Sequence, residues 1–196
     1  MRKNHICLLL LTLLPAIPAA AQRLSLSTNV LDWANLGTAN LQAGFSLERR
    51  ISLHAGVRYN NWSFGSAEQG SPFQNRARTA SAGMRYWPWN VYSSWWAGAR
   101  AQVEEYNRGG FLGHSETEEG LAWGLALAMG YSWLFTDHWN IDFGIGFWGG
   151  RTRYTLYRCP RCGRIVSDDE GRPIQNAWKW FVLPSNEIQV SLTYIF

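Results

Sequence analysis

Residues 121–135 read LAWGLALAMGYSWLF, and this stretch decides the fold class. Every second residue from Leu121 to Phe135 is large and apolar, while Ala, Gly and Ser occupy the positions between them as far as Ser132. The alternative is a short buried helix, but a period of two has no reason to arise at 3.6 residues per turn. In a small barrel, bulky side chains face lipid and small ones fit the narrow interior. The stretch therefore predicts a membrane-spanning β-strand.

The same period of two recurs along most of the chain. Strands are predicted at residues 23–35, 39–48, 51–62, 76–86, 94–106, 121–135, 139–153 and 186–196. The last of these places Ile188, Val190 and Leu192 on one face, continuing to Tyr194 and Phe196. A strand that is apolar on one face and polar on the other suits a wall between lipid and a polar lumen. It also resembles the C-terminal strand of bacterial outer-membrane barrels, whose last residue is typically Phe.

The predicted connections alternate between short turns and long loops. Short turns are expected at 48–50, 87–90 and 136–138, and long loops at 63–75, 107–119 and 154–184. Outer-membrane barrels have this asymmetry, with the short turns on the periplasmic side. The sequence thus predicts an all-β fold: an eight-stranded antiparallel transmembrane β-barrel with short periplasmic turns and longer extracellular loops.

The first 21 residues are expected to be a secretory signal peptide. Arg2 and Lys3 precede an apolar run over 6–14, and three alanines end at Ala21, where cleavage is expected. The run is too short to span a bilayer, which takes roughly 20 residues. Residues 22–196 then form one barrel domain, and the expected location is the bacterial outer membrane.

Composition supports this class and argues against others. The chain has 12 Trp, 8 Tyr, 9 Phe and 19 Gly, and aromatic girdles at two membrane interfaces would account for the aromatic excess. Lys and Arg number 18 against 14 Asp and Glu, and two of the cations lie in the predicted leader. The remaining charge is nearly balanced and no dense basic cluster occurs, which argues against nucleic acid as a partner. The expected partners are outer-membrane lipid and a protein of the envelope or cell surface.

Several short segments resemble one protein family. They are Ser27-Thr28-Asn29-Val30-Leu31, Ala39-Asn40-Leu41, Arg85-Tyr86-Trp87-Pro88, Tyr106-Asn107 with Gly109-Gly110, and Tyr157-Arg158-Cys159-Pro160-Arg161-Cys162-Gly163. Their order and spacing resemble an uncharacterised family of Bacteroidota outer-membrane β-barrel proteins, a domain of unknown function sometimes encoded near fimbria-type genes. The resemblance implies an envelope barrel without an established activity. Residues 179–186 depart from the family pattern, since only Phe181 and Pro184 are kept from a Phe-Gly-Pro-Thr-Lys-like run.

Cys159 and Cys162 form a CxxC motif in the longest predicted loop. Two thiolates at this spacing can bind one Zn²⁺, but a closed zinc site needs four ligands and the chain has no second CxxC. His114 from another loop, with Asp168 or Asp169, would have to complete such a site. A local disulfide, which export favours, is an alternative, as are free thiols or a metal shared between chains. No cofactor is otherwise expected.

Charged and polar residues are expected to fill the barrel interior. The predicted inward network consists of His54, Arg58, Arg85, Arg100, Glu104, Asp142 and Glu187. Three arginines oppose three carboxylates, as buried charges require. The interior of an eight-stranded barrel is just wide enough for side chains to fill, so a wide pore is not expected. A narrow proton or ion path past Arg58, Arg100 and Asp142 is the alternative.

Trp178, Lys179, Trp180 and Phe181 are the candidate binding residues of the longest loop. Exposed aromatics with interspersed cations are residue types that anchor partner contacts, although they would also pack against the barrel wall. The triplet His114-Ser115-Glu116 raises a hydrolase reading, but adjacent residues in an acidic loop rarely hold catalytic geometry. We therefore expect a non-enzymatic structural or interaction protein of the envelope. A lipid-modifying outer-membrane enzyme and a narrow channel are the alternatives.

Overall fold

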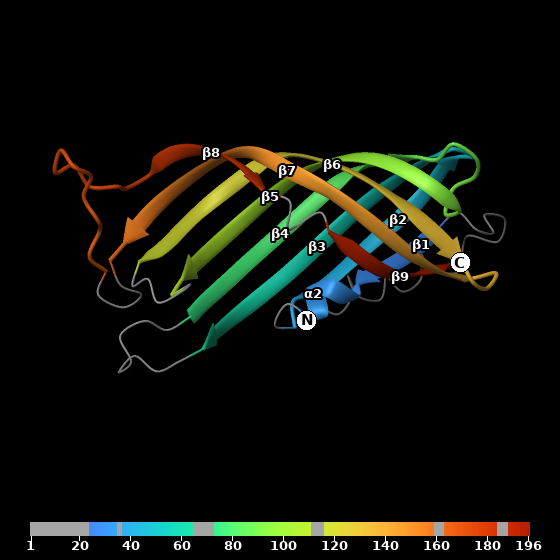
Figure 1. The fold of residues 1–196 in the computed structure, drawn as a ribbon, viewed down its shortest axis with the longest axis horizontal. Coiled ribbons are helices and arrows are strands. Elements are labelled where there is room, and N and C mark those ends of the chain that lie inside the picture. The colour runs from blue at the N-terminus through green and yellow to red at the C-terminus, as the bar shows by residue number, and fades with distance from the viewer. Residues whose placement is uncertain (1–23, 35–36, 65–72, 111–115, 159–162, 184–187) are drawn as a thin grey trace, which may run out of the picture.

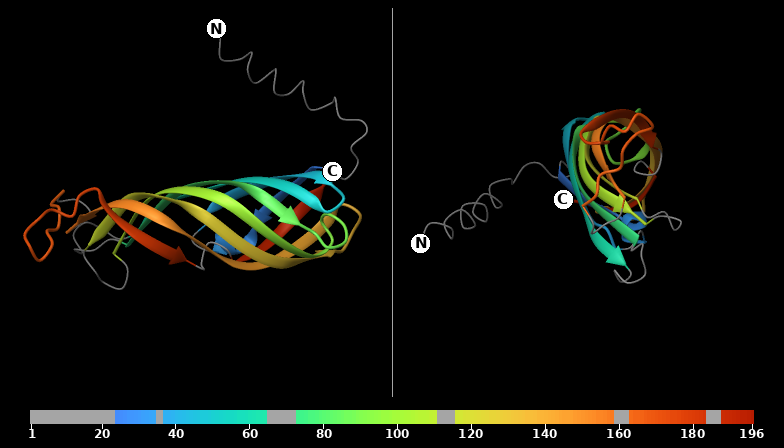
Figure 2. Two further views of the ribbon diagram at one scale, coloured as in Figure 1. Left: turned by 90° about the horizontal axis from the view of Figure 1, so that it is seen from above. Right: turned by 90° about the vertical axis from the view of Figure 1, so that its left-hand side faces the viewer.

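A computed structural model describes residues 24–34, 37–64, 73–110, 116–158, 163–183 and 188–196, and these form one antiparallel sheet (Figure 1). The hydrogen-bonded strand order is β6-β5-β4-β3-β2-β1-β9-β7-β8, and β6 also pairs with β7. That additional pairing closes the sheet into a ring. Viewed along the long axis, the strands wrap around a common centre (Figure 2).

The ring contains nine strands and one short helix among the described residues. They are β1 (Leu24–Asn29), α2 (Val30–Ala34), β2 (Ala39–Glu48), β3 (Ile51–Phe64), β4 (Phe73–Tyr86), β5 (Ser94–Gly109), β6 (Thr117–Leu134), β7 (Trp139–Tyr157), β8 (Ala177–Leu183) and β9 (Gln189–Ile195). The all-β antiparallel fold class is confirmed. No helix in the described ranges is long and apolar enough to cross a membrane.

The predicted loop over 154–184 is wrong in part, because it contains β8. Both β8 and β9 pair with β7: β9 with residues 139–144 and β8 with residues 148–154. The two strands follow one another along the same neighbour, so nine strands occupy eight positions around the ring. The 19 residues of β7 leave room for a second partner beyond the seven-residue β9.

The predicted first strand, 23–35, is also too long, since β1 ends at Asn29 and α2 begins at Val30. The Asn29 side chain ends the strand by accepting a hydrogen bond from the Leu31 backbone N–H at 3.2 Å. This is the capping geometry that starts a helix. Gly37, with a φ of 70°, then returns the chain toward β2, and its N–H donates to the Trp33 carbonyl at 2.8 Å.

The two ends of the ring differ. Residues 49–50, 87–93 and 135–138 connect strands at one end, the turn end, where Phe196 N–H donates to the Leu24 carbonyl. The ends of β3, β5 and β7 and the starts of β4, β6 and β8 lie at the other, the loop end (Figure 2). The predicted loop over 107–119 is shorter than expected, because Asn107 and Gly109 still pair with Glu119 and Thr117. Consequently β5, β6 and β7 extend further toward the loop end than β1 and β2.

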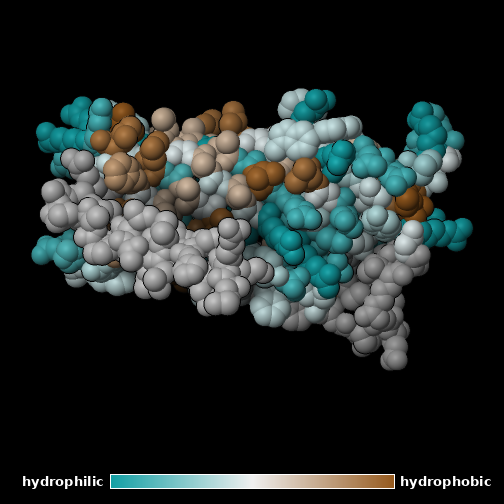
Figure 3. All heavy atoms as spheres, turned by 180° about the vertical axis from the view of Figure 1, so that it is seen from behind, coloured by the Kyte–Doolittle hydropathy of each residue, from teal (hydrophilic) through white to brown (hydrophobic). Residues whose placement is uncertain are grey.

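Side chains are distributed inside out relative to a water-soluble protein. Buried positions are mainly polar and include Ser25, Ser27, Ser52, Thr79, Arg85, Gln102, Glu104, Ser132, Asn140, Asp142, Thr152, Ser191 and Thr193. Exposed positions are mainly apolar and include Leu41, Phe45, Leu53, Val57, Met84, Leu125, Leu127, Met129, Ile145 and Phe147. On the face drawn in Figure 3, hydrophobic residues lie mostly toward the turn end and centre, and hydrophilic ones gather toward the loop end.

Candidate functional site

The turn end is closed by a buried aromatic cluster. Trp87, Tyr92 and Trp96 pack together with Ile195, and the Trp87 and Trp96 ring centroids lie 6.4 Å apart. Trp87 Nε1 donates to Ser52 Oγ at 2.8 Å. Trp87 lies in the predicted turn over 87–90, but its side chain turns inward and is fully buried. The cluster therefore forms a floor across the ring.

A charged layer lies next to this floor. Arg85 Nη1 is 3.5 Å from Asp142 Oδ2, and the Arg85 guanidinium lies 4.0 Å from the Trp96 ring centroid. Asp142 also accepts hydrogen bonds from Ser132 and from Thr193, the latter at 3.0 Å. Each oxygen of the carboxylate thus has a partner, which a buried charge requires.

His54 belongs to the same layer. Its Nε2 lies 2.8 Å from Ser52 Oγ, and its Nδ1 lies 3.2 Å from Gln42 Nε2. Since Ser52 also accepts from the Trp87 indole, hydrogen bonds join the floor to the wall of the ring. The residues lock one another in position, which is a structural arrangement. No nucleophile–base–acid series occurs among these contacts.

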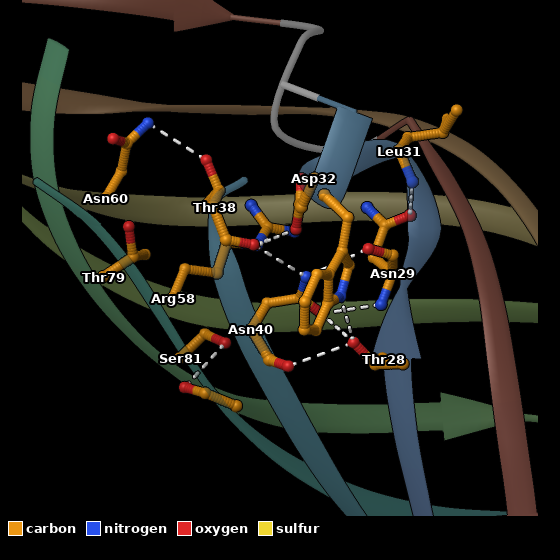
Figure 4. Close-up of polar contacts among 12 residues, drawn as sticks. Thr28, Asn29, Leu31, Asp32, Thr38, Asn40, Arg58, Asn60, Thr79 and Ser81 are labelled. Carbon is orange, nitrogen blue, oxygen red and sulfur yellow. Dashed lines mark hydrogen bonds and ion pairs between the residues drawn. The ribbon is translucent and has the colours of Figure 1, made fainter. Parts of the chain in front are cut away.

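Helix α2 contributes its one polar residue, Asp32, to a layer of polar contacts higher in the ring (Figure 4). Asp32 Oδ2 is 3.1 Å from Arg58 Nε, so the helix is tied to β3 by an ion pair. Asn40 Oδ1 accepts from the Asn29 backbone N–H at 2.6 Å, and Asn40 Nδ2 donates to the Asn29 carbonyl at 2.9 Å. Asn60 Nδ2 donates to Thr38 Oγ1 at 3.0 Å. Helix α2 itself lies beside β9 and β2, and Asp32 borders the inner cavities together with Arg58.

A chamber of about 240 Å³ lies at the loop end, bounded by β5, β6, β7 and β8. Lys179 Nζ is 2.5 Å from Glu118 Oε2, and Tyr106 OH donates to Glu118 Oε1 at 2.5 Å. Arg108 Nη2 is 2.5 Å from Glu104 Oε1 on the same strand. Two ion pairs therefore border the chamber.

The predicted interior residues that the structure describes lie on the inner side of the ring. His54, Arg85 and Asp142 share the layer next to the floor, Arg58 and Arg100 border a cavity beside it, and Glu104 borders the loop-end chamber. Glu187 lies outside the described residues. Arg58 pairs with Asp32 and Glu104 pairs with Arg108, two partners that the sequence reading did not include.

The predicted loop-binding residues lie on strand β8, so their assignment to a loop is wrong. Trp178 and Trp180 point outward and are exposed, whereas Lys179 and Phe181 border the inner chamber. The reason is strand geometry, in which successive side chains point to opposite faces. Arg151 Cζ lies 4.9 Å from the Trp180 ring and 5.6 Å from the Trp178 ring.

Cys159 and Cys162 lie outside the described residues, as does His114. Within the part of the chain that the structure describes, no group of three or more His, Cys, Asp or Glu is placed to hold a metal ion.

Sequence reasoning missed most of the loop-end chamber. Tyr106, Arg108 and Glu118 were assigned to the end of a strand or to a loop, although continuing the alternation beyond Glu104 puts the first two on the inner face. Trp148 likewise continues the inward positions of β7 after Asp142. Tyr106 and Trp148 lie within predicted strands, whereas the polar composition around Arg108 and Glu118 favoured a loop.

The model for the family described as "Protein of unknown function (DUF3575)" matches residues 6–196, and the chain therefore belongs to this family. Comparisons with curated proteins and with solved structures gave no match.

Proposed function

We propose that this member of the DUF3575 family is a non-enzymatic β-barrel of the bacterial outer membrane whose lumen is blocked and whose loop end binds a partner in the cell envelope. The observation that carries the proposal is the inside-out distribution of side chains. A ring of hydrogen-bonded strands with an apolar exterior satisfies its backbone groups internally, as a membrane-spanning sheet must.

Strands β2 to β7 are long enough to cross a bilayer, whereas β1 and β9 have only six and seven residues. A tilted transmembrane strand needs about 9–11 residues, and β5, β6 and β7 have 16, 18 and 19. The surplus lies at the loop end and carries outward charges such as Glu105, Arg151 and Arg153. This part would project from the membrane, with Trp95, Trp133 and other exposed aromatics forming a girdle at the turn end.

The interior supports a structural or interaction role over transport. The floor of Trp87, Tyr92 and Trp96 covers the turn end. Above it, two cavities beside Arg100 have volumes of only about 30 Å³ each, roughly one water molecule's share of liquid volume. Solutes would not pass such a column without rearrangement of the buried ion pairs.

The outer surface of β8 is the partner site we propose. Trp123, Trp178 and Trp180 surround Arg151, and the Trp123 and Trp178 ring centroids lie 5.1 Å apart in an edge-to-face arrangement. Trp and Arg are the residue types most enriched at energetic hot spots of protein interfaces. Their position at the projecting end gives an envelope protein access to them.

Two experiments test the proposal separately. Membrane insertion predicts that the purified chain folds into phospholipid vesicles, resists carbonate extraction and migrates differently in gels before and after boiling. The blocked lumen predicts no conductance steps in planar bilayers. A chain that carbonate releases from vesicles would refute the barrel proposal, and regular conductance steps would establish the channel alternative.

The partner site is tested by affinity capture from intact envelopes. Replacement of Trp180 by Ala should abolish the capture of a specific protein. The matched control Trp95→Ala, which removes an exposed Trp at the turn end, should leave that capture unchanged. Equal capture by both variants would refute the assignment of this surface. A changed lipid profile in cells that express the chain would instead favour the lipid-modifying enzyme.

A further inference from the structure

We propose that the open edge of β8 binds an extended segment of a partner protein, which adds one strand to the wall at the loop end. The inference rests on the partner site proposed above for β8 and deepens it by naming the binding mode. It follows from the strand order, from the composition and exposure of β8, and from the backbone groups along its edge.

Strand β8 has a neighbouring strand on one side only. Its residues pair with 148–154 of β7, and no other strand of the described ranges pairs with it. The other side of β7 is occupied by β6 along its whole length, so β8 and β9 share one edge of β7. β9 in turn pairs with β1, whereas β8 ends the hydrogen-bonded order. Within the part of the chain that the structure describes, β8 therefore has one open edge.

The edge is open because the strands that would cover it do not reach β8. β1 lies beside β9 but ends at Asn29, opposite Ser191, and the chain then enters α2. β2 begins only at Ala39, opposite Tyr59, although β3 continues to Phe64. Neighbouring strands lie about 4.8 Å apart, and the described residues place no strand at that position beside β8. An added strand therefore has access to it.

The sequence of β8 favours pairing with another strand. Its seven residues, AWKWFVL, are rich in aromatic and β-branched side chains and contain one charge. That charge, on Lys179, is held by Glu118 and lies over the Tyr154 ring, so it is not free to prevent strand pairing as charged edge residues commonly do. Trp180 and Val182 are the most exposed large hydrophobic side chains of the described residues, at 74% and 70%. A neighbouring strand would cover part of both.

The backbone groups along the open edge specify an extended polypeptide. In a strand, the N–H and C=O groups of successive residues point to opposite sides, so about half of those in β8 point away from β7. Lipid cannot satisfy such groups, which is why open edges do not occur against hydrocarbon. A further strand satisfies them in register, as in β-strand addition. Apolar residues at alternate positions of that strand would form cross-strand pairs with Trp178, Trp180 and Val182 on the outer face.

A second copy of this chain in the same membrane does not fit this edge. Identical strands that pair in antiparallel fashion are related by a two-fold axis normal to their sheet. In a membrane-spanning ring that axis lies in the plane of the membrane, so the rotation would turn one ring upside down. A parallel pair would need an axis along the strand, which would join the inner face of one copy to the outer face of the other. The partner is therefore a different protein of the envelope or cell surface.

Amide hydrogen exchange tests whether the edge is open. The full chain is measured in detergent micelles, so that the result does not depend on insertion into a bilayer. Alternate amides of residues 177–183 should exchange rapidly, because about half of them have no acceptor on β7. Uniformly slow exchange over the seven residues would show that the chain covers this edge itself and would overturn the proposal.

Three matched peptides test the binding mode. The first, Thr-Val-Thr-Val-Thr-Val-Thr with blocked ends, should bind saturably and slow the rapidly exchanging amides of β8. The second carries N-methyl groups on its three valines, and the third carries them on three of its threonines. The two sets of N–H groups point to opposite edges of the peptide strand, so one methylated peptide should bind at least tenfold less tightly than the other. Absence of saturable binding by the first peptide would overturn the proposal.

The remaining outcomes separate this inference from the proposed function. Equal binding by the two methylated peptides would refute edge pairing and show that contacts are made by side chains alone, while the outer-membrane barrel and the capture that depends on Trp180 could still stand. Dimers of the chain that the first peptide dissociates would identify a second copy as the occupant and would also refute the inference. Release of the chain from vesicles by carbonate would refute the barrel without bearing on exchange in micelles.

Discussion

Replacing Asp142 with Asn should lower the free energy of unfolding by about 3–5 kcal/mol, the usual cost of removing one partner of a buried ion pair. The Arg85 and Asp142 side chains are only 8% and 4% exposed, and their charged atoms lie 3.5 Å apart. A solvent-exposed pair at this distance would contribute about 0–1 kcal/mol, so burial decides the magnitude. The Trp96 ring beneath Arg85 is a weaker partner and does not replace the carboxylate.

The variant isolates charge because Asn retains an oxygen that accepts from Ser132 or Thr193. Unfolding in urea from lipid vesicles, followed by tryptophan fluorescence, gives the free energy by linear extrapolation. The double variant Arg85→Met with Asp142→Leu should recover most of the loss, since apolar replacement of a whole buried pair is often neutral. A loss below about 1 kcal/mol in Asp142→Asn would refute the view that Arg85 depends on this carboxylate.

Three further outcomes are expected. Gly130→Ala should destabilise the ring by about 1–3 kcal/mol, because an added Cβ would lie 2.0 Å from the Phe143 carbonyl oxygen; unchanged urea unfolding would contradict this. Trp87→Ala should cost about 3–5 kcal/mol through the cavity it leaves in the floor, and unfolding within error of wild type would show that the floor contributes no stability. Backbone and side-chain hydrogen bonds from Arg172 lower the pKa of Asp168. The turn that contains Asp168 and Arg172 should therefore stay ordered at pH values above the ordinary aspartate pKa. Its order should be lost only as the pH falls through the lower pKa that Asp168 has in the folded state. NMR amide shifts that change at the ordinary pKa, or that change equally in Asp168→Asn, would contradict that assignment.

Much of the fold could be predicted because strand geometry makes side-chain direction depend on position alone. Once Leu125 faces outward, Ala126 must face inward, and the rule extends along β6 without knowledge of its neighbours. The same rule placed Arg85, Glu104 and Asp142 inside the ring. It did not indicate which charges meet, because partners on different strands depend on register and on the order of strands around the ring.

The alternation in the sequence by itself determined the all-β class and the inner and outer faces of the strands, since both follow from local geometry. Only the tertiary structure decided three features. Asp32 reaches Arg58 because the chain after Asn29 turns into α2. Residues 177–183 form a strand because the edge of β7 is free beyond β9. Trp87 enters the floor because its turn bends inward, and no periodicity sets the direction of a turn side chain.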